Sequence, residues 1–183
     1  MRYAALLRGI NVGGRTAVPM AALKAELERL GLTEVKTHGN SGNAVFTSDL
    51  PEAALEGMIE RALEVRFGFP IPALVRSGAE LREAIEKLPF PAEEIARAQA
   101  AAGDAASLYA VFLSMPPGAD AVERFGALKK PGEAFVVAGR MFYLLLDHSI
   151  RECRMFSALG SLDGRATVRN WNTVMKLSAL IMA

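Results

Sequence analysis

Strand and helix signals alternate from the start of the chain, and their order restricts the fold more than any other feature. A nearly continuous apolar run at residues 3–10, interrupted by Arg8, has the length of a buried strand. Apolar side chains then recur at helical spacing from Met20 to Leu30, and Gly31 is a typical residue to end a helix. The first part of the chain is therefore predicted to be a strand followed by a helix.

A β-hairpin is predicted next. Residues 33–38 and 43–48 have strand composition, and the connecting Gly39-Asn40-Ser41-Gly42 is rich in residues that tolerate positive φ. Pro51 opens a second helix that runs to Phe67, and residues 71–76 form a fourth strand. The resulting order, βαββαβ, is that of the split βαβ unit.

The second half of the chain repeats this order. Strands are expected at 107–113, 133–138, 141–146 and 165–168, and helices at 120–128, 150–159 and 171–181. We find no residue motif shared by the two halves, so the repeat rests on element order alone. The predicted fold class is α/β (α+β), with two βαββαβ units in tandem and a C-terminal helix.

Three segments make up the predicted domain organisation. Residues 1–88 hold the first unit, with a further helix that starts at a capping box formed by Ser77 and Glu80. Residues 89–106 are alanine-rich and are expected to be a linker with a short helix. Residues 107–183 hold the second unit and the terminal helix.

Composition excludes several classes of function. A chain of 183 residues can bury a core without disulfides, and its net charge of +1 leaves no polybasic arm for binding nucleic acid or membranes. One Cys and two His make no zinc cluster, so we expect no metal and no cofactor. No segment has the composition of a signal peptide or a membrane span, which predicts a cytoplasmic protein.

Charge is unevenly spread behind this average. Residues 1–50 carry six Lys or Arg against four acids, and residues 107–183 carry nine against six. Residues 51–106 carry six against ten, and their Glu side chains alternate with Arg in a way typical of solvated helix faces. The mild excess of base therefore lies at the two ends of the chain.

Two polar loops are expected to meet at one end of the first sheet. In a split βαβ unit the first two strands run parallel, so the loop after the first strand and the hairpin turn emerge together. The loop contributes Arg8, Asn11, Gly13 and Gly14, and the turn contributes Ser41 and Asn43. Closely spaced glycines allow backbone N–H groups to form an anion-binding nest. The same residues also fit an ordinary connection without a ligand, with Arg8 paired to a nearby Glu.

A third polar segment precedes the terminal helix. Asn170 is placed to cap this helix, and Arg169 puts a cation beside its free N–H groups. Asn172 follows in the first turn, while Trp171 shares a face with apolar residues and is expected in the core or at an interface. Capping with an ion pair explains the segment equally well.

Side chains typical of catalysis are few. Cys153 lies on an apolar helix face and is expected in the core. Asp147 and His148 fit a turn with a helix cap, and Ser41 lacks the spacing of a nucleophile elbow. The sequence thus assigns no catalytic residue and no reaction.

Three motifs resemble those of a bacterial family known as domain of unknown function 1697. They are Tyr3-Ala4-Ala5-Leu6-Leu7-Arg8-Gly9-Ile10-Asn11-Val12-Gly13-Gly14, Ser41-Gly42-Asn43-Ala44-Val45-Phe46, and Arg169-Asn170-Trp171-Asn172-Thr173-Val174 with Lys176-Leu177. The resemblance spans nearly the whole chain and implies a soluble α/β protein built from two ferredoxin-like halves. It implies no activity. The sequence departs from the family pattern at residues 147–152, where many members are glycine-rich and basic.

The favoured hypothesis is a pocket for a small phosphorylated or carboxylated molecule, because converging donors with few acid or base groups suit binding. Its predicted residues are Arg8, Asn11, Gly13, Gly14, Ser41, Asn43, Arg169, Asn170 and Asn172. One alternative is binding of single-stranded RNA, because RNA-recognition modules share the βαββαβ order. Those modules stack bases on aromatic side chains of a central strand, and the corresponding residues 42–46 contain few aromatic side chains. The other is a protein interaction module. Oligomeric state is not encoded in any of these patterns.

Overall fold

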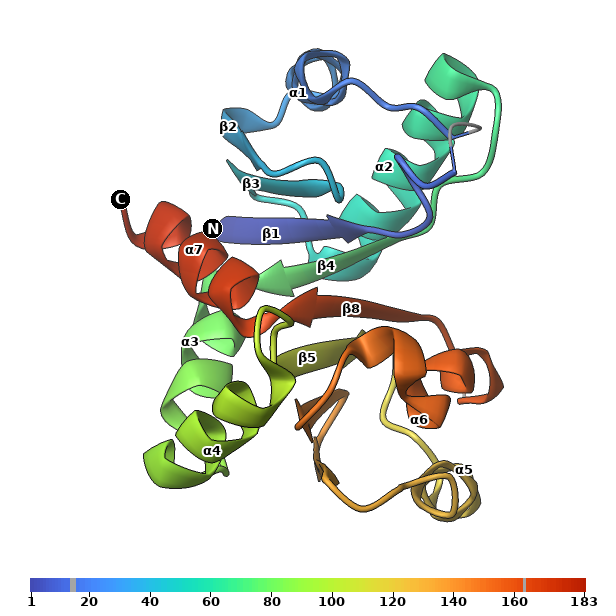
Figure 1. Ribbon diagram of the computed structural model, residues 1–183. Helices are drawn as coiled ribbons and strands as arrows, with labels where there is room; N and C mark the ends of the chain where they lie inside the picture. The colour runs from blue at the N-terminus through green and yellow to red at the C-terminus, as the bar shows by residue number, and fades with distance from the viewer. Residues whose placement is uncertain (14–15, 163) are drawn as a thin grey trace. The chain divides into compact units, whose positions relative to one another are not determined.

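The computed structural model describes residues 1–13, 16–162 and 164–183 (Figure 1). The chain divides into two compact units. Unit 1 comprises Met1–Glu86 together with Met175–Ala183, and unit 2 comprises Lys87–Val174. Each unit holds one four-stranded antiparallel sheet, called sheet 1 and sheet 2 below.

Unit 1 has the predicted βαββαβ order followed by one more helix. Its elements are β1 (Arg2–Leu7), α1 (Met20–Arg29), β2 (Thr33–His38), β3 (Asn43–Thr47), α2 (Glu52–Phe67), β4 (Ala73–Ser77) and α3 (Gly78–Glu86). Sheet 1 has the strand order β2-β3-β1-β4. The capping box at the start of α3 is confirmed, since Glu80 Oε2 accepts from the backbone N–H of Ser77 and Ser77 Oγ accepts from that of Glu80.

The core of unit 1 forms because β1 alternates two apolar faces. Tyr3, Ala5 and Leu7 lie in one buried cluster with apolar side chains of α1 and α2, such as Leu23 and Ile59. These helices cover the same side of sheet 1 (Figure 1).

Unit 2 repeats this topology. Its elements are α4 (Ala92–Ala102), β5 (Leu108–Leu113), α5 (Ala119–Gly126), β6 (Glu133–Ala138), β7 (Met141–Leu146), the 3-10 helix η1 (Ile150–Glu152), α6 (Arg154–Ser157), the 3-10 helix η2 (Leu159–Ser161) and β8 (Ala166–Asn170). Sheet 2 has the order β6-β7-β5-β8, the same as in sheet 1. The chain is therefore two ferredoxin-like βαββαβ arrangements in tandem, and α7 (Trp171–Met182) follows them.

Two details differ from the sequence prediction. The helix expected at 150–159 is split into η1, α6 and η2, because Cys153 has an extended backbone with φ −76° and ψ 116°. As a result Met155 is buried and Phe156 is 40% exposed. In addition, the helix expected in the linker segment, α4, packs against β7 and is part of unit 2.

The expectation that no residue motif recurs between the halves is wrong. The last strand of each sheet begins at an equivalent position and carries a common pattern, Ala73-Leu74-Val75-Arg76-Ser77 in β4 and Ala166-Thr167-Val168-Arg169-Asn170 in β8. Both strands lead directly into a helix. The repeat is thus visible in residues as well as in element order.

None of the helices in the described part of the chain is long and apolar enough to cross a membrane.

Candidate functional site

The Asn11 side chain joins the loop after β1 to the β2–β3 hairpin. Its Nδ2 donates to the carbonyl oxygens of Asn40 at 2.7 Å and Val18 at 3.0 Å. Its Oδ1 accepts from the Val18 N–H at 2.8 Å. Asn11 has φ 55°, in the left-handed region that asparagine tolerates better than most residues. The predicted meeting of these two loops is confirmed.

A second asparagine fixes the hairpin itself. Asn43 is buried, and its Nδ2 donates to the carbonyl oxygen of His38 and to Ser41 Oγ. The backbone of Gly42 accepts from the Leu7 N–H at 2.8 Å. A Cβ on Gly42 would lie 2.7 Å from Leu7 Cβ at a φ of +77°, so this position requires glycine. The amide groups of both asparagines therefore build the loops and are not directed at a ligand.

In the loop after β1, the exposed residues of interest are Arg8, Gly9 and Gly13. The Arg8 backbone N–H donates to Pro72, whereas its exposed guanidinium makes no hydrogen bond or ion pair with any described residue. Gly9 and Gly13 have φ of 74° and 64°, with open space where a Cβ would be. Gly14, also predicted for the site, lies outside the described residues.

Three connections emerge at the end of sheet 1 where β1 finishes. Leu7 pairs with Ala73 at the start of β4, and Leu6 pairs with Asn43 at the start of β3. We call this region, formed by residues 8–13, 16–19, 38–43 and 65–72, the loop end of sheet 1. These segments contain arginines and a histidine but no Asp or Glu. The loop end is therefore a locally cationic surface.

Arg169, by contrast, is inside unit 2. It is 7% exposed, and its guanidinium donates to Thr167 Oγ1 and to the carbonyl oxygen of Val168, both at 2.8 Å. Burial lowers the pKa of Arg169 to about 10, because the charged form loses hydration. The arrangement is that of a buried cation bound by its own strand.

Asn170 and Asn172 lie together beside Trp171. Asn170 Oδ1 accepts from the N–H and the hydroxyl of Thr173, which confirms the predicted cap of α7. The three residues contribute to the lining of a pocket of about 460 Å³. The rest of the lining comes from α4, the α4–β5 connection and the start of β5, namely Ile95, Gln99, Asp104, Ala105, Ala106, Ser107 and Leu108. We call this the α4–α7 pocket.

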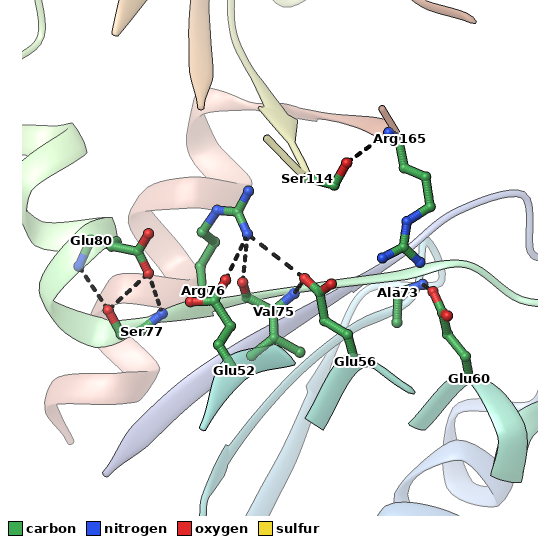
Figure 2. A network of polar contacts seen from close by, with 10 residues as sticks. All are labelled: Glu52, Glu56, Glu60, Ala73, Val75, Arg76, Ser77, Glu80, Ser114 and Arg165. Carbon is green, nitrogen blue, oxygen red and sulfur yellow. Dashed lines mark hydrogen bonds and ion pairs between the residues drawn. The ribbon is translucent and has the colours of Figure 1, made fainter. Parts of the chain in front are cut away.

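The second buried arginine, Arg76, was not among the predicted site residues. It is the counterpart of Arg169 in β4, is 2% exposed and likewise donates to the carbonyl oxygen of the preceding valine, here Val75 at 2.6 Å. Glu52 Oε1 lies 3.2 Å from its guanidinium and Glu56 Oε1 lies 3.9 Å from it (Figure 2). The recurring Val-Arg pair at the end of two equivalent strands is the signal that would have identified it.

The glutamates of α2 are not merely a solvated face. Glu56 Oε1 accepts from the backbone N–H of Val75, and Glu60 Oε1 accepts from that of Ala73, both at 2.9 Å (Figure 2). Because β4 is the outer strand of sheet 1, these N–H groups have no strand to bond to. The two carboxylates are one helical turn apart, and this spacing lets them accept hydrogen bonds from the N–H groups of alternate residues along the edge of β4.

A buried carboxylate in unit 2 was also missed. The Glu133 side chain is fully buried, with His148 Nε2 3.1 Å from its Oε1 and the Lys130 N–H donating to its Oε2 at 2.8 Å. His148 Nδ1 lies 2.7 Å from Asp147 Oδ1. His148 thus links two carboxylates, where the sequence predicted a turn with a helix cap. Nearby Cys153 is buried as predicted, and burial raises the pKa of its thiol.

Comparison with known proteins agrees with this architecture and assigns no activity. One solved structure, of conserved bacterial protein SP0830 from Streptococcus pneumoniae, matches with a TM-score of 0.74 and 27% sequence identity, over 98% of each chain. No curated protein matches the chain. A family described as protein of unknown function, DUF1697, matches residues 1–143. The third motif, at residues 169–177, lies outside the matched range, and the first two lie within it. The chain belongs to this DUF1697 family, as the resemblance indicated.

Proposed function

We propose that the protein binds a small phosphorylated or carboxylated molecule at the loop end of sheet 1. The observation that carries this proposal is the exposed Arg8 guanidinium, which has no partner among the described residues, at a surface whose three connecting segments contain no carboxylate. An anion approaching Arg8 would be attracted by its guanidinium, while the nearby Glu60 carboxylate is already bonded to the Ala73 N–H. Arginine suits both candidate groups, because its planar fork matches the oxygens of phosphate and carboxylate.

The backbone around Arg8 supports the same ligand chemistry. Gly9, Asn11 and Gly13 all have positive φ, and turns of this kind direct neighbouring N–H groups toward one side. Glycine at two of these positions lets a ligand approach the main chain closely. The N–H groups of Asn11 and Val12 already donate to Thr16, at 2.8 Å and 3.5 Å. The Arg8 guanidinium is therefore the main donor that this loop offers to an anion.

Pre-organisation follows from the two asparagines. Asn11 and Asn43 hold the loop and the hairpin through side-chain bonds to the backbone, so the ligand need not order them on binding. In this proposal Asn11, Asn43 and Ser41 are positioning residues, and Arg8 and Gly13 are the described residues nearest the anion. Participation of Arg169, Asn170 and Asn172 in the same site remains a prediction.

Thermal-shift and calorimetric titration with inorganic phosphate, sugar phosphates and dicarboxylates test the proposal. We expect at least one anion to raise the melting temperature, with an affinity that weakens as salt is added, because the attraction is screened. Arg8→Ala should weaken binding about tenfold or more. Arg82→Ala removes an exposed arginine from α3 and serves as the matched control.

The proposal fails if no anion of these classes binds, or if Arg8→Ala and Arg82→Ala weaken binding equally. Equal effects would mean that net charge alone attracts the anion. Binding of RNA oligomers in preference to all small anions would support the RNA alternative instead.

A further inference from the structure

The α4–α7 pocket has a chemistry different from that of the loop end of sheet 1. Its only formally charged lining residue is Asp104, whose negative charge opposes binding of a phosphate or carboxylate. Its volume of about 460 Å³ is within the range of small-molecule sites. A ligand of this pocket is therefore expected to be uncharged or cationic.

Trp171 provides a planar apolar surface in the pocket. The ring is half-buried, and the ring of the buried Tyr143 lies behind it, with centroids 6.0 Å apart and planes tilted by 49°. Contact with Tyr143 restricts how far the indole can move. An indole held in this way favours a flat, aromatic ligand, which can stack on its accessible part.

Unused hydrogen-bonding groups flank the indole. The Asn172 side chain has no hydrogen bond with a described residue, so its amide keeps two donors and an acceptor. Asn170 uses Oδ1 to cap α7 and keeps its Nδ2 donors. Asp104, which also lines the pocket, adds an acceptor.

Gln99, which also lines the pocket, already has its hydrogen-bonding groups occupied. Gln99 Nε2 donates to the carbonyl oxygens of Gly103 and Ala105, and its Oε1 accepts from Ser107 Oγ at 3.1 Å. These bonds fix the turn between α4 and β5 and leave Gln99 no free donor. Ligand specificity therefore falls to Asn170, Asn172 and Asp104.

From this combination we infer that the α4–α7 pocket binds an uncharged nitrogen heterocycle of the nucleobase type, stacked on Trp171 and hydrogen-bonded along one edge by Asn172 and Asp104. A nucleobase has both a π-face and an edge that alternates donors and acceptors, and asparagine amides and aspartate carboxylates are groups that pair with such edges. This site is distinct in chemistry from the proposed anion site and does not depend on it.

Trp171 is the only tryptophan of the chain, so its fluorescence reports on this pocket alone. We would titrate the full chain with adenosine, guanosine, cytidine and uridine, exciting at the red edge of the indole band, with ribose as the negative probe. At least one nucleoside should change the emission saturably, and ribose should not. The matching nucleoside monophosphate should bind several-fold more weakly, because its phosphate adds charge near Asp104.

Two variants make the inference falsifiable. Asn172→Ala should weaken nucleoside binding about tenfold, and Asp104→Asn should reduce the difference between nucleoside and monophosphate. Asp120→Asn, which neutralises an exposed acid of α5 outside the pocket, should leave both unchanged. Circular dichroism would verify that Asn172→Ala is folded, and Asn172→Asp is the second variant if it is not.

The inference is overturned if no nucleoside changes the fluorescence saturably, or if folded variants at Asn172 bind as well as the unmodified chain. Tighter binding of the monophosphate than of the nucleoside would also overturn it, because the pocket would then prefer an anion. Loss of anion binding in Arg8→Ala leaves these titrations unaffected, so the two proposals fail separately.

Discussion

At the scale of single residues, Asn11 decides the conformation of the longest polar loop in unit 1. It satisfies three backbone groups and adopts a φ that most residues avoid. Asn11 stabilises the loop in two ways, through its side-chain hydrogen bonds and through its tolerance of a positive φ. Substitution by glycine separates the two effects, because glycine tolerates the positive φ but makes no side-chain hydrogen bond.

Asn11→Gly should lower the free energy of unfolding by about 1 kcal/mol, because the hydrogen bonds are lost at a partly exposed site. Asn11→Ala should cost about 2 kcal/mol, because alanine adds strain at positive φ. Urea unfolding measures both. Equal losses in the two variants would show that backbone conformation at this residue contributes nothing.

His148 is expected to matter for stability because of Glu133. Without the imidazole, a fully buried carboxylate loses one of its few partners and keeps the Lys130 N–H and the Cys153 thiol. His148→Ala should therefore lower the free energy of unfolding by about 2 kcal/mol. In the double variant Glu133→Gln/His148→Ala the loss should be smaller than the sum of the single losses, and additive losses would contradict the link.

Cys153 predicts a pH effect with a definite sign. Burial raises the pKa of its thiol above the value of about 9 for an unfolded cysteine. The unfolded chain therefore loses this proton first, and raising the pH past about 9 favours unfolding. A thiol reagent should label the folded protein slowly even at pH 9 and the urea-unfolded protein rapidly, and Cys153→Ala should lack this pH-dependent loss of stability.

At the scale of elements, α2 protects the outer strand of sheet 1. Glu56→Ala should speed hydrogen exchange of the Val75 amide about tenfold or more, and Glu60→Ala should do the same for Ala73, because each N–H loses its acceptor. Nuclear magnetic resonance resolves the individual amides. Glu64→Ala, from the exposed continuation of the same helix face, is the control and should change neither.

Sequence patterns within a few residues correctly predicted the elements that are stabilised by contacts between residues close together in the sequence. The hairpin of β6 and β7 has the predicted bounds, because strand composition and the glycine turn at Gly139 are both local signals. The prediction of one helix at 150–159 was wrong, because the same apolar spacing also fits two short helices separated by the extended residue Cys153.

The contacts of the candidate site needed the tertiary structure. Topology alone predicted that the loop after β1 would meet the hairpin. It could not show that the side-chain amides of Asn11 and Asn43 hydrogen-bond to the backbone. Nor could it show that glutamates of α2 accept hydrogen bonds from β4, because the residues that form these bonds are not adjacent in the sequence. Arg169 was expected near a surface because a helix N-terminus follows it, whereas its side chain lies on a buried face.

At the scale of the whole molecule, unit 1 is built from both ends of the chain. Arg2 donates to the carbonyl oxygen of Ile181 at 2.6 Å, and the Ile181 side chain packs so closely on Gly78 that a Cβ there would lie 2.5 Å from its Cγ2. Residues 175–183 are therefore part of the structure of unit 1 and not a dispensable tail.

Truncation after Val174 should lower protection from hydrogen exchange across unit 1, first at β1 and α3, which contact the removed segment. Mass spectrometry of peptic peptides measures this. Removal of Met182 and Ala183 alone, both exposed, is the control and should have little effect. Uniform loss of protection in both units would contradict the assignment of residues 175–183 to unit 1.

This discontinuity has a consequence for protein synthesis. The ribosome makes residues 1–86 first, and these residues emerge before residues 175–183, which complete unit 1, have been made. All of unit 2, residues 87–174, is synthesised between the two parts of unit 1. The nascent unit 1 must therefore wait with part of its apolar surface uncovered while a whole second unit is translated, and in that interval it is a substrate for chaperones and a target for proteases.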